Sequence, residues 1–267
     1  MGLSERAGIA HAARRIIIEQ SYRAKVGHIG SALSIADLVA AVVSGPMGGE
    51  GADRDRLVLS KGHAALALYA VLHLQGRIDD EQIASYCADG TALGVHPEPG
   101  LEGVDFGTGS LGQGLSIGAG AALAAKRQRS DRKVYVIMSD AELNEGSVWE
   151  AVMFAAHHKL DNLVLLIDLN GQQAMNYTPE VLDLGAVDEK FRVFGWDAQV
   201  TPGHDHEALA AALDHAAGAT GQPSVIVATT TFGHGVSFME SVIDWHYLPL
   251  TDEQFATAMA ELDEVTA

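Results

Sequence analysis

Two apolar segments of the sequence end in polar side chains whose types suit the binding of a metal ion. The segment "VYVIMSD" (134–140) ends in Asp140, and "LVLLIDLN" (163–170) ends in Asn170. Carboxylate and amide oxygens are hard ligands. With a backbone carbonyl and oxygens of a bound ligand, these two would complete an octahedral Mg²⁺ or Ca²⁺ site. Two ordinary alternatives stay open: Asp140 caps the helix that follows it, and Asn170-Gly171 forms a plain turn.

Four of the twelve histidines lie beside glycine or proline, or at a loop turn. They are His28 in "GHIGS", His63 in "SKGHAA", His96 in "GVHPEP" and His246 in "DWHY". Imidazole transfers protons near neutral pH and can donate hydrogen bonds to phosphate oxygens. Together with the predicted metal ligands, these histidines favour a site for a phosphorylated ligand.

A glycine-rich segment, "GTGSLGQG" (107–114), precedes the small-residue helical pattern "LSIGAGAALAA". Such a turn lets backbone N–H groups at a helix N-terminus approach a ligand closely, although close helix packing would also need small residues. No GxxxxGK[ST] segment is present, and no GxGxxG follows a predicted strand. The sequence therefore gives little support to a nucleoside triphosphate or NAD site.

Three segments rich in β-branched residues are apolar without alternation, which is typical of strands buried on both faces of a parallel sheet. They span 133–139, 162–169 and 223–231, and 55–61 is a weaker candidate. Helical periodicity is found at 3–22, 32–44, 63–75, 80–88, 110–128, 145–159, 205–217 and 251–263. This alternation predicts a doubly wound α/β fold with a mostly parallel sheet and helices on both faces, in a single domain over 1–267. Ligands bind at the carboxyl ends of such strands, where Asp140 and Asn170 are expected to meet.

The composition favours a globular intracellular protein. Of the 267 residues, 48% are hydrophobic, and the net charge of −18 disfavours binding to nucleic acid or to an anionic membrane. The one cysteine, Cys87, cannot form an intrachain disulfide and fits a reducing compartment. The sequence shows no signal-peptide core and no apolar run of membrane-spanning length. We therefore expect a cytoplasmic protein.

The sequence resembles the thiamine-diphosphate domain of transketolase over nearly its whole length. Five blocks match that family in order and separation: "GHIGSALSIADLVAAV", "LSKGHAALALYAVL", "GTGSLGQGLSIGAGAALAAK", "AELNEGSVWEAVMFAAHHKLDNLVLLIDLNG" and "GVSFMESVIDWH". Five ordered blocks are far more specific than any single motif. The resemblance implies the family's α/β fold, with thiamine diphosphate and Mg²⁺ (or Ca²⁺ in its place) as cofactors. It also implies transfer of a two-carbon ketol unit from a ketose or ketose phosphate to an aldose acceptor.

The same resemblance implies roles for individual residues. Asp140, Asn170 and the backbone carbonyl of Gln172 would coordinate the metal ion, which binds the diphosphate. The other expected cofactor contacts are His63, Gly109, Leu111, Ala141, Glu142 and His246. The expected catalytic residues are His28, His96 and Glu145. The two histidines would line the substrate channel and assist proton movements. Glu145, supported by Glu150, would lie at a subunit interface in the network that couples to the cofactor's activating glutamate.

The sequence departs from the family pattern at three positions. Ser139-Asp140-Ala141 stands where Gly-Asp-Gly is usual, and Ala141 would cost on the order of 1 kcal/mol if that position needs a positive φ. Tyr247 follows His246 where glycine is usual, and it is expected to narrow the pocket. His234, in "GHG" where Gly-Lys-Gly is usual, is a candidate for an additional phosphate contact.

The family's second domain, which carries the activating glutamate, has no counterpart in the sequence. The sequence thus resembles the N-terminal component of a split transketolase, which would act with a C-terminal component, two copies of each. Two alternatives stay open. One is a component of another thiamine-diphosphate enzyme that accepts a 2-oxo acid. The other is a non-catalytic regulatory protein, which the change at Ala141 would permit.

Overall fold

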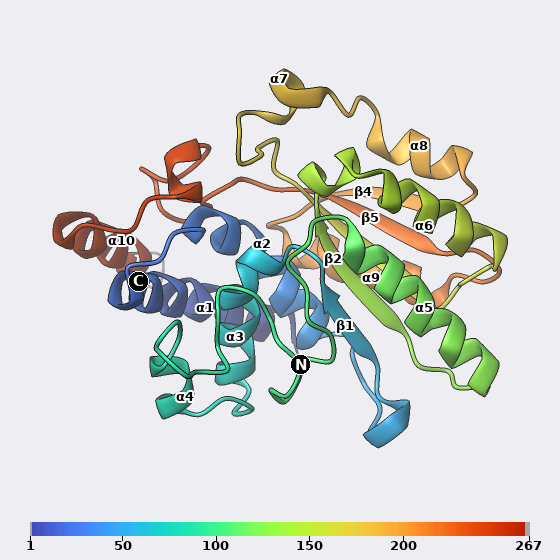
Figure 1. Ribbon diagram of the computed structural model, residues 1–267, viewed down its shortest axis with the longest axis horizontal. Helices are drawn as coiled ribbons and strands as arrows, with labels where there is room; N and C mark the ends of the chain where they lie inside the picture. The colour runs from blue at the N-terminus through green and yellow to red at the C-terminus, as the bar shows by residue number, and fades with distance from the viewer. Residues whose placement is uncertain (1, 265–267) are drawn as a thin grey trace.

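A five-stranded, wholly parallel sheet forms the centre of the chain, and the computed structural model describes residues 2–264 (Figure 1). The strands, in the order β1-β2-β3-β5-β4, are β1 (Arg56–Leu59), β2 (Val134–Ser139), β3 (Leu163–Leu169), β5 (Ser224–Thr229) and β4 (Asp197–Pro202). The residue pair Ser139 and Asp168 lies in register between β2 and β3. Asp140 and Asn170 therefore follow adjacent strand ends, as the sequence predicted.

Ten α-helices of the described chain connect and flank the strands. They are α1 (Leu3–Ala24), α2 (Ile29–Val43), α3 (Ala65–Leu74), α4 (Asp80–Ala84), α5 (Gln113–Gln128), α6 (Gly146–His157), α7 (Thr178–Leu182), α8 (Val187–Val193), α9 (His206–Gly218) and α10 (Asp252–Glu264). Short 3-10 turns lie at η1 (Gly51–Asp53), η2 (Gly62–Ala64), η3 (Asp140–Asn144) and η4 (Ile243–His246). The last three of these 3-10 turns carry residues that matter for the site.

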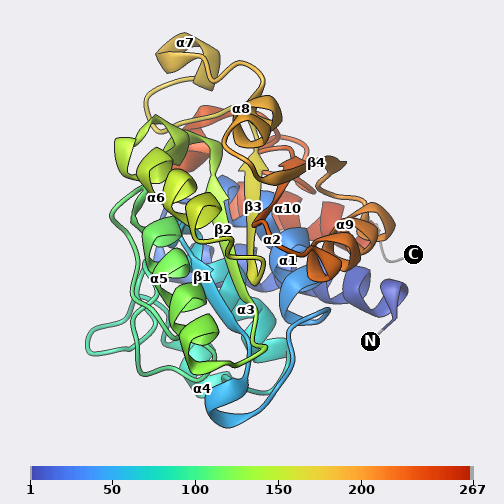
Figure 2. The same cartoon turned by 90° about the vertical axis from the view of Figure 1, so that its right-hand side faces the viewer.

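The sheet separates two hydrophobic cores, because successive side chains of each strand point to opposite faces. Leu57, Tyr135 and Leu166 pack towards α1, α2, α3 and α9, whereas Val136 and Leu165 pack towards α5, α6 and α8. Figure 2 shows these two layers of helices on either side of the strands. The unbroken apolar runs of the strands follow from this burial on both faces, which confirms the predicted doubly wound α/β fold.

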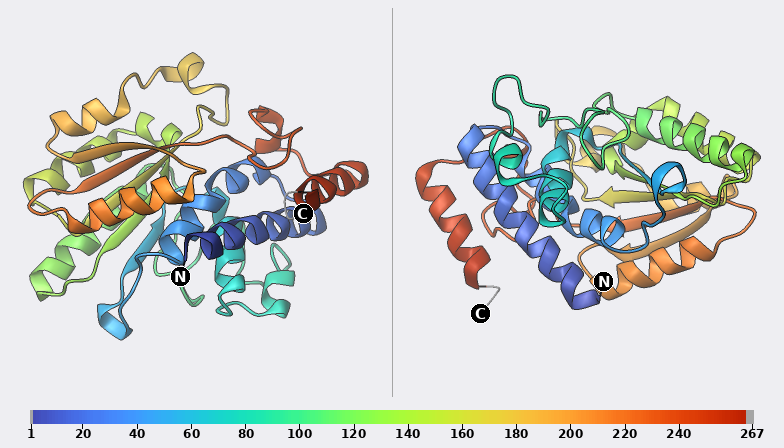
Figure 3. Two further views of the ribbon diagram at one scale, coloured as in Figure 1. Left: turned by 180° about the vertical axis from the view of Figure 1, so that it is seen from behind. Right: turned by 90° about the horizontal axis from the view of Figure 1, so that it is seen from below.

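Helix α2 is buried along its whole length, because it lies between the sheet and the helices α1 and α3. Its sequence, "IGSALSIADLVAAVV", is apolar or small at every position except Asp37, which pairs with Arg14, as expected for a helix with no solvent face. Helix α10 packs against α1 at the edge of the molecule (Figure 3). No helix within residues 2–264 is both long and apolar enough to cross a membrane.

Some predicted boundaries were wrong. Strand β4 was not predicted, because this edge strand has the half-exposed, partly polar sequence "DAQVTP". The short helices α7 and α8 were also missed, and α2 begins at Ile29, earlier than the predicted 32. The predicted domain bounds, 1–267, include four residues that lie outside the described part of the chain.

Candidate functional site

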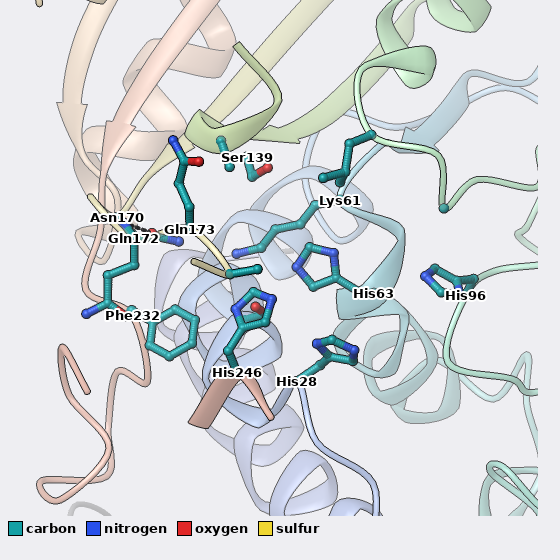
Figure 4. Close-up of a pocket in the computed structure, with 15 residues that line it drawn as sticks. His28, Lys61, His63, His96, Ser139, Asn170, Gln172, Gln173, Phe232 and His246 are labelled. Atoms are coloured by element: carbon teal, nitrogen blue, oxygen red, sulfur yellow. Dashed lines mark hydrogen bonds between the residues drawn. The ribbon is translucent and has the colours of Figure 1, made fainter. Parts of the chain in front are cut away.

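A cavity of about 200 Å³ lies at the carboxyl ends of β1, β2 and β3 (Figure 4). Its walls come from eight separate parts of the chain, so it exists only in the folded protein. The lining residues are His28, Ser31, Lys61, His63, His96, Gly109, Leu111, Ser139, Ala141, Asn170, Gln172, Gln173, Ala174, Phe232 and His246. The four loop histidines singled out in the sequence are thus brought together in one cavity.

Three of these histidines form a triangle of imidazole rings. The ring centroids are 5.1 Å apart for His28 and His63, 5.1 Å for His28 and His246, and 5.2 Å for His63 and His246. The backbone of His28 has φ of 62°, an uncommon value for a residue with a side chain, and its N–H donates to the His246 carbonyl at 3.1 Å. A strained backbone at such a position is typical of functional sites, where the surrounding structure holds it.

The triangle is electrically neutral near pH 7. Burial, followed by the neighbouring charge of Lys61, lowers the pKa of His63 well below its usual value. Burial also lowers the pKa of His246 to about 4, and the pKa of His28 is shifted in the same direction. Nδ1 of His28, Nε2 of His63 and Oγ of Ser31 are buried without a hydrogen-bond partner among the described residues. Since buried polar atoms are normally paired, these atoms fit a polar ligand in the cavity.

Lys61 and Asp168 form a buried ion pair beneath the cavity, which the sequence analysis did not identify. The Lys61 side chain is 2% exposed, and its Nζ donates to Oδ2 of Asp168 at 2.5 Å. Asp168 also accepts hydrogen bonds from the hydroxyls of Ser34 (2.7 Å) and Thr230, and from the amide of Asn170 (2.8 Å). A charge inside the apolar run "NLVLLIDL" was the sequence signal for Asp168, because such a charge must be paired.

Asp140 is fully buried, and its carboxylate binds the loop that follows β3. Oδ2 accepts from the Gly171 N–H at 2.8 Å and from the Thr178 hydroxyl at 3.3 Å, and Oδ1 accepts from the Ala141 N–H. Burial, with the nearby charge of Asp168 as the second cause, raises the pKa of Asp140 to about 7. A nearby cation would offset that cost, so the carboxylate is suited to a metal ion.

Asn170 lies at the cavity wall, with its amide held in one orientation. Its Nδ2 donates to Asp168, and its Oδ1 accepts from the Gln172 N–H at 2.9 Å. The structure therefore brings Asp140, Asn170 and Gln172 into one corner of the site, which agrees with the predicted metal ligands as a group. Their coordination of a metal ion stays a prediction.

The glycine-rich turn contacts His96 on the opposite wall. Gly109 has φ of 147°, and a Cβ added there would lie 2.9 Å from Cδ2 of the His96 ring. Leu111, next along the turn, is 40% exposed and lines the cavity. Glycine is thus needed at position 109 for both its φ and the space that the imidazole fills.

Ala141 lines the cavity without the backbone strain that its sequence position suggested. It lies in the 3-10 turn η3 and is not among the described residues with positive φ. The conformational penalty considered for alanine therefore does not arise. Alanine therefore replaces glycine here without a conformational energy penalty.

Glu142 does not line the cavity among the described residues, and its contact with the cofactor stays a prediction. Its fully buried carboxylate accepts from the Ser60 hydroxyl, the Gly112 N–H at 3.0 Å and the Ser139 N–H at 2.8 Å. Side-chain direction within a tight turn depends on tertiary packing, which the sequence pattern does not contain. The residue instead ties the glycine-rich turn to the ends of β1 and β2.

Glu145 and Glu150 lie exposed on the surface of η3 and α6, away from the cavity lining. The structure thus separates Glu145 from His28 and His96, and its catalytic role stays a prediction about an interface. The aliphatic part of Glu145 packs against Gly112, where a Cβ would lie 2.5 Å from it.

Tyr247 and His234 also lie outside the cavity lining of the described chain, which contradicts the expectations for both. Tyr247 is 56% exposed and does not narrow the pocket. His234 stacks on His204 at 3.6 Å, and its Nδ1 lies 3.1 Å from Glu240. It does not face the cavity because Arg14 fixes the turn by donating to the His234 carbonyl.

Asp37, His204 and His234 have ligand atoms within 4.8 Å of one another, which is close enough to hold a metal ion. These atoms already have partners, however. Asp37 pairs with Arg14 and with the rings of His204 (2.7 Å) and His206 (2.9 Å). The Thr231 N–H donates to Nε2 of His204, so that nitrogen has no free lone pair. This group stabilises the turn after β5.

Ligands bind at the carboxyl ends of the strands in open parallel α/β sheets, and the cavity of histidines and a buried lysine at that edge places this chain in the class of ligand-binding α/β domains. The family model "Transketolase, thiamine diphosphate binding domain" matches residues 5–263. The chain therefore belongs to the transketolase family, as its thiamine-diphosphate-binding domain.

Individual relatives agree with this assignment. The chain is 38% identical to the 6-deoxy-6-sulfo-D-fructose transketolase subunit of Clostridium sp. (strain MSTE9), covering 96% of this chain and 95% of that protein. It is also 38% identical to an apulose-4-phosphate transketolase subunit from Phocaeicola vulgatus, over 94% and 91% of the two chains. Transketolase from Campylobacter jejuni superposes with a TM-score of 0.87 at 30% identity, and the match covers 98% of this chain but 43% of that enzyme.

Proposed function

We propose that this chain is the N-terminal subunit of a two-component transketolase, which transfers a two-carbon ketol unit from a ketose or ketose phosphate to an aldose acceptor. The observation that carries this proposal is the match in length: the chain covers at least 91% of relatives that are themselves named as subunits. It covers less than half of the transketolase from Campylobacter jejuni. A partner chain would therefore supply the rest of the active site.

The cavity fits the diphosphate group of thiamine diphosphate. Lys61 provides a positive charge at the cavity floor, and His63 and His246 provide ring nitrogens that can donate to phosphate oxygens. An anionic ligand would raise the lowered pKa values of these histidines and pair the buried Nε2 of His63. When bound, the cofactor would supply the nucleophilic carbon that carries the two-carbon unit.

A divalent metal ion, Mg²⁺ or Ca²⁺ in its place, would be held by Asp140, Asn170 and the carbonyl of Gln172. Support comes from the raised pKa of Asp140, because burial and the Asp168 charge leave that carboxylate short of positive charge. Oxygen ligands of this kind match the preference of Mg²⁺. The metal would also offset the charge of the diphosphate.

His28 and His96 are proposed to handle protons on the donor and acceptor sugars. His28 forms one corner of the imidazole triangle in the cavity. Figure 4 shows His96 across the cavity from Asn170 and Gln172. A neutral imidazole can accept a proton from a sugar hydroxyl and return it, so two such rings suit both halves of a group transfer. Glu145 would act at the interface with another chain, where its exposure leaves it available.

Calorimetry on the chain, co-purified with its partner, tests the cofactor assignment. Asp140→Ala should abolish Mg²⁺-dependent binding of thiamine diphosphate, because a neutral amide and a carbonyl cannot replace a charged ligand. Asn170→Ala should weaken binding less, since it removes a neutral oxygen. Unchanged affinity in a folded Asp140→Ala sample would rule out the metal assignment.

Assembly is tested by activity. The isolated chain should show no ketol transfer with saturating Mg²⁺ and thiamine diphosphate, and activity should appear on mixing with the partner and saturate near one copy of each chain. Two copies of each chain are proposed, in the cytoplasm. Substantial turnover by the isolated chain, free of partner by mass spectrometry, would refute this. Turnover of 2-oxo-acid donors in place of ketoses would favour a different thiamine-diphosphate enzyme. The non-catalytic alternative rested on Ala141, whose unstrained backbone removes that reason.

A further inference from the structure

Two tyrosine hydroxyls join the loop after β3 to the segment that contains η4. The Tyr247 hydroxyl donates to the carbonyl of Ala174 in the loop. The Tyr177 hydroxyl, in the loop, donates in the opposite direction, to the carbonyl of Ser241 at 3.1 Å. We call this reciprocal pair, Tyr177 and Tyr247 with their two acceptors, the tyrosine clasp.

The clasp fixes the tip of a loop whose base is already fixed. At the base, Gly171 donates its N–H and Thr178 its hydroxyl to Asp140, at 2.8 and 3.3 Å. Asn170, which directly precedes Gly171, and Gln172, which follows it, both lie at the cavity wall. On the other side of the clasp, Tyr247 directly follows His246 in the sequence. The clasp thus joins the two parts of the site that are proposed to hold the metal and the diphosphate.

Apart from the clasp, the hydrogen bonds of residues 172–177 in the described chain stay within residues 170–182: Gln173 donates to the Asn176 carbonyl at 2.9 Å, Asn176 donates to Glu180 at 2.6 Å, and Gln172 forms a β-bridge with Tyr177. Both polar atoms of the Gln172 amide, and Nε2 of Gln173, are buried without hydrogen-bond partners among the described residues. Met175, at the tip, is 78% exposed and contributes little packing. Bonds within the loop and α7 do not attach its exposed tip to the rest of the fold, so the tip opens easily unless the clasp holds it.

Ser241, which accepts one of the two tyrosine hydrogen bonds, has a strained backbone. Its φ is 58°, an uncommon conformation for a residue with a side chain, and its N–H donates to the Phe232 carbonyl at 2.9 Å. Its carbonyl meanwhile accepts the Tyr177 hydroxyl. A strained residue is retained where the surrounding bonds require it, and this one lies at the clasp.

We propose that Tyr177 and Tyr247 are positioning residues that hold the loop of Asn170 and Gln172 closed over the cofactor site. This inference rests on the proposed function, since it concerns the same cavity. Neither tyrosine lines the cavity within the described chain, and both rings are exposed, at 42% and 56%. They therefore act through the loop. The apparent affinity for the cofactor is proportional to the fraction of molecules with the loop closed, so it falls when the clasp is weakened.

Calorimetry with thiamine diphosphate and Mg²⁺, on the chain co-purified with its partner, measures this effect. Tyr177→Phe and Tyr247→Phe remove one hydroxyl each and retain the ring. Each should weaken cofactor binding by up to about fivefold, equivalent to ~1 kcal/mol, and the double variant by up to about 25-fold. The turnover rate at saturating Mg²⁺ and cofactor should stay within twofold of wild type, because saturation closes the loop again.

Tyr22→Phe is the matched control. The Tyr22 hydroxyl also makes a hydrogen bond between two distant parts of the chain, to Asp252 at 2.9 Å, but it lies on α1 and α10. It should leave cofactor affinity unchanged. If wild type binds thiamine diphosphate and the double variant binds within twofold of it, the clasp is refuted and the proposed function stands. If wild type does not bind, both are refuted.

Discussion

The buried ion pair between Lys61 and Asp168 should dominate the stability of the site. Both side chains are at most 2% exposed. Lys61→Met would leave the Asp168 carboxylate with neutral donors, and Asp168→Asn would leave the Lys61 ammonium without a counter-ion. Removing one partner of a buried pair typically costs about 3–5 kcal/mol, because the other charge stays buried. We expect each single variant to lose an amount in that range in urea unfolding.

The double variant Lys61→Met/Asp168→Asn buries neither charge, so its loss should be smaller than the sum of the two single losses. We expect a coupling energy of at least ~2 kcal/mol from the double-mutant cycle. The exposed helical pair Arg192 and Asp188 provides the control, with coupling of about 0.5 kcal/mol or less. A coupling for Lys61 and Asp168 as small as that of the control would refute the reasoning.

The dependence on pH gives a second measure of the same pair. Burial alone would raise the pKa of Asp168, but Lys61 and the hydroxyl donors lower it on balance from its usual 3.8. A carboxylate whose pKa is lower in the folded state contributes stability above its unfolded pKa and loses it as the pH falls through the folded value. The contribution of Asp168 to the stability difference between wild type and the double variant should therefore be constant above about pH 5 and change only under more acid conditions, whereas the effect of the lost charges on the raised pKa of Asp140 should add a change near pH 7.

Three further predictions concern the cavity walls. Gly30→Ala should lower the free energy of unfolding in urea by about 1–3 kcal/mol, since the added methyl would overlap the Phe232 ring. The helical control Gly8→Ala, with open space around it, should not be destabilised. Equal stabilities of the two variants would contradict this packing. Acidification from pH 6.5 towards pH 4 should lower the melting temperature of the cofactor-free chain, because burial lowers the pKa of His246 to about 4 and the unfolded chain takes up the proton first. In His246→Asn this decrease in melting temperature on acidification should be smaller. An unchanged decrease would exclude His246 as its source. Ala141→Gly should leave calorimetric affinity for thiamine diphosphate within twofold, because there is no positive φ to relieve; tenfold tightening would show that the methyl obstructs the cofactor.

The parts of the site that follow strand ends could be predicted from the sequence. Asp140 and Asn170 each come after an unbroken apolar run, and parallel strands place such ends side by side. The family resemblance located His63 and His246, which no local pattern would have paired across so long a separation. These residues converge because the fold, and not the local sequence, brings their loops together.

The inward direction of individual side chains could not be predicted. Glu142 directly follows Ala141 of the cavity wall, yet it turns to Gly112 and Ser60 because those groups need an acceptor in the interior. Lys61 follows a short strand, a position that usually reaches solvent, and only the burial of Asp168 explains why it points inward. Such side-chain orientations depend on contacts with residues distant in the sequence, which the periodicity of the sequence does not reveal.

The order of the strands has a consequence for the synthesis of this protein on the ribosome. Strand β5 lies between β3 and β4, although it is made after both. The edge of nascent β3 therefore stays without its neighbour until residues 224–229 emerge. His246 follows later still, so roughly 10–45 s separate the translation of His28 from that of His246 at about 5–20 residues per second. Between the emergence of β3 and that of β5 the unpaired apolar edge is open to aggregation, and the cofactor cannot assist because its site is still incomplete. Chaperone binding to the nascent chain should accordingly be strongest after β4 has emerged and before β5 has.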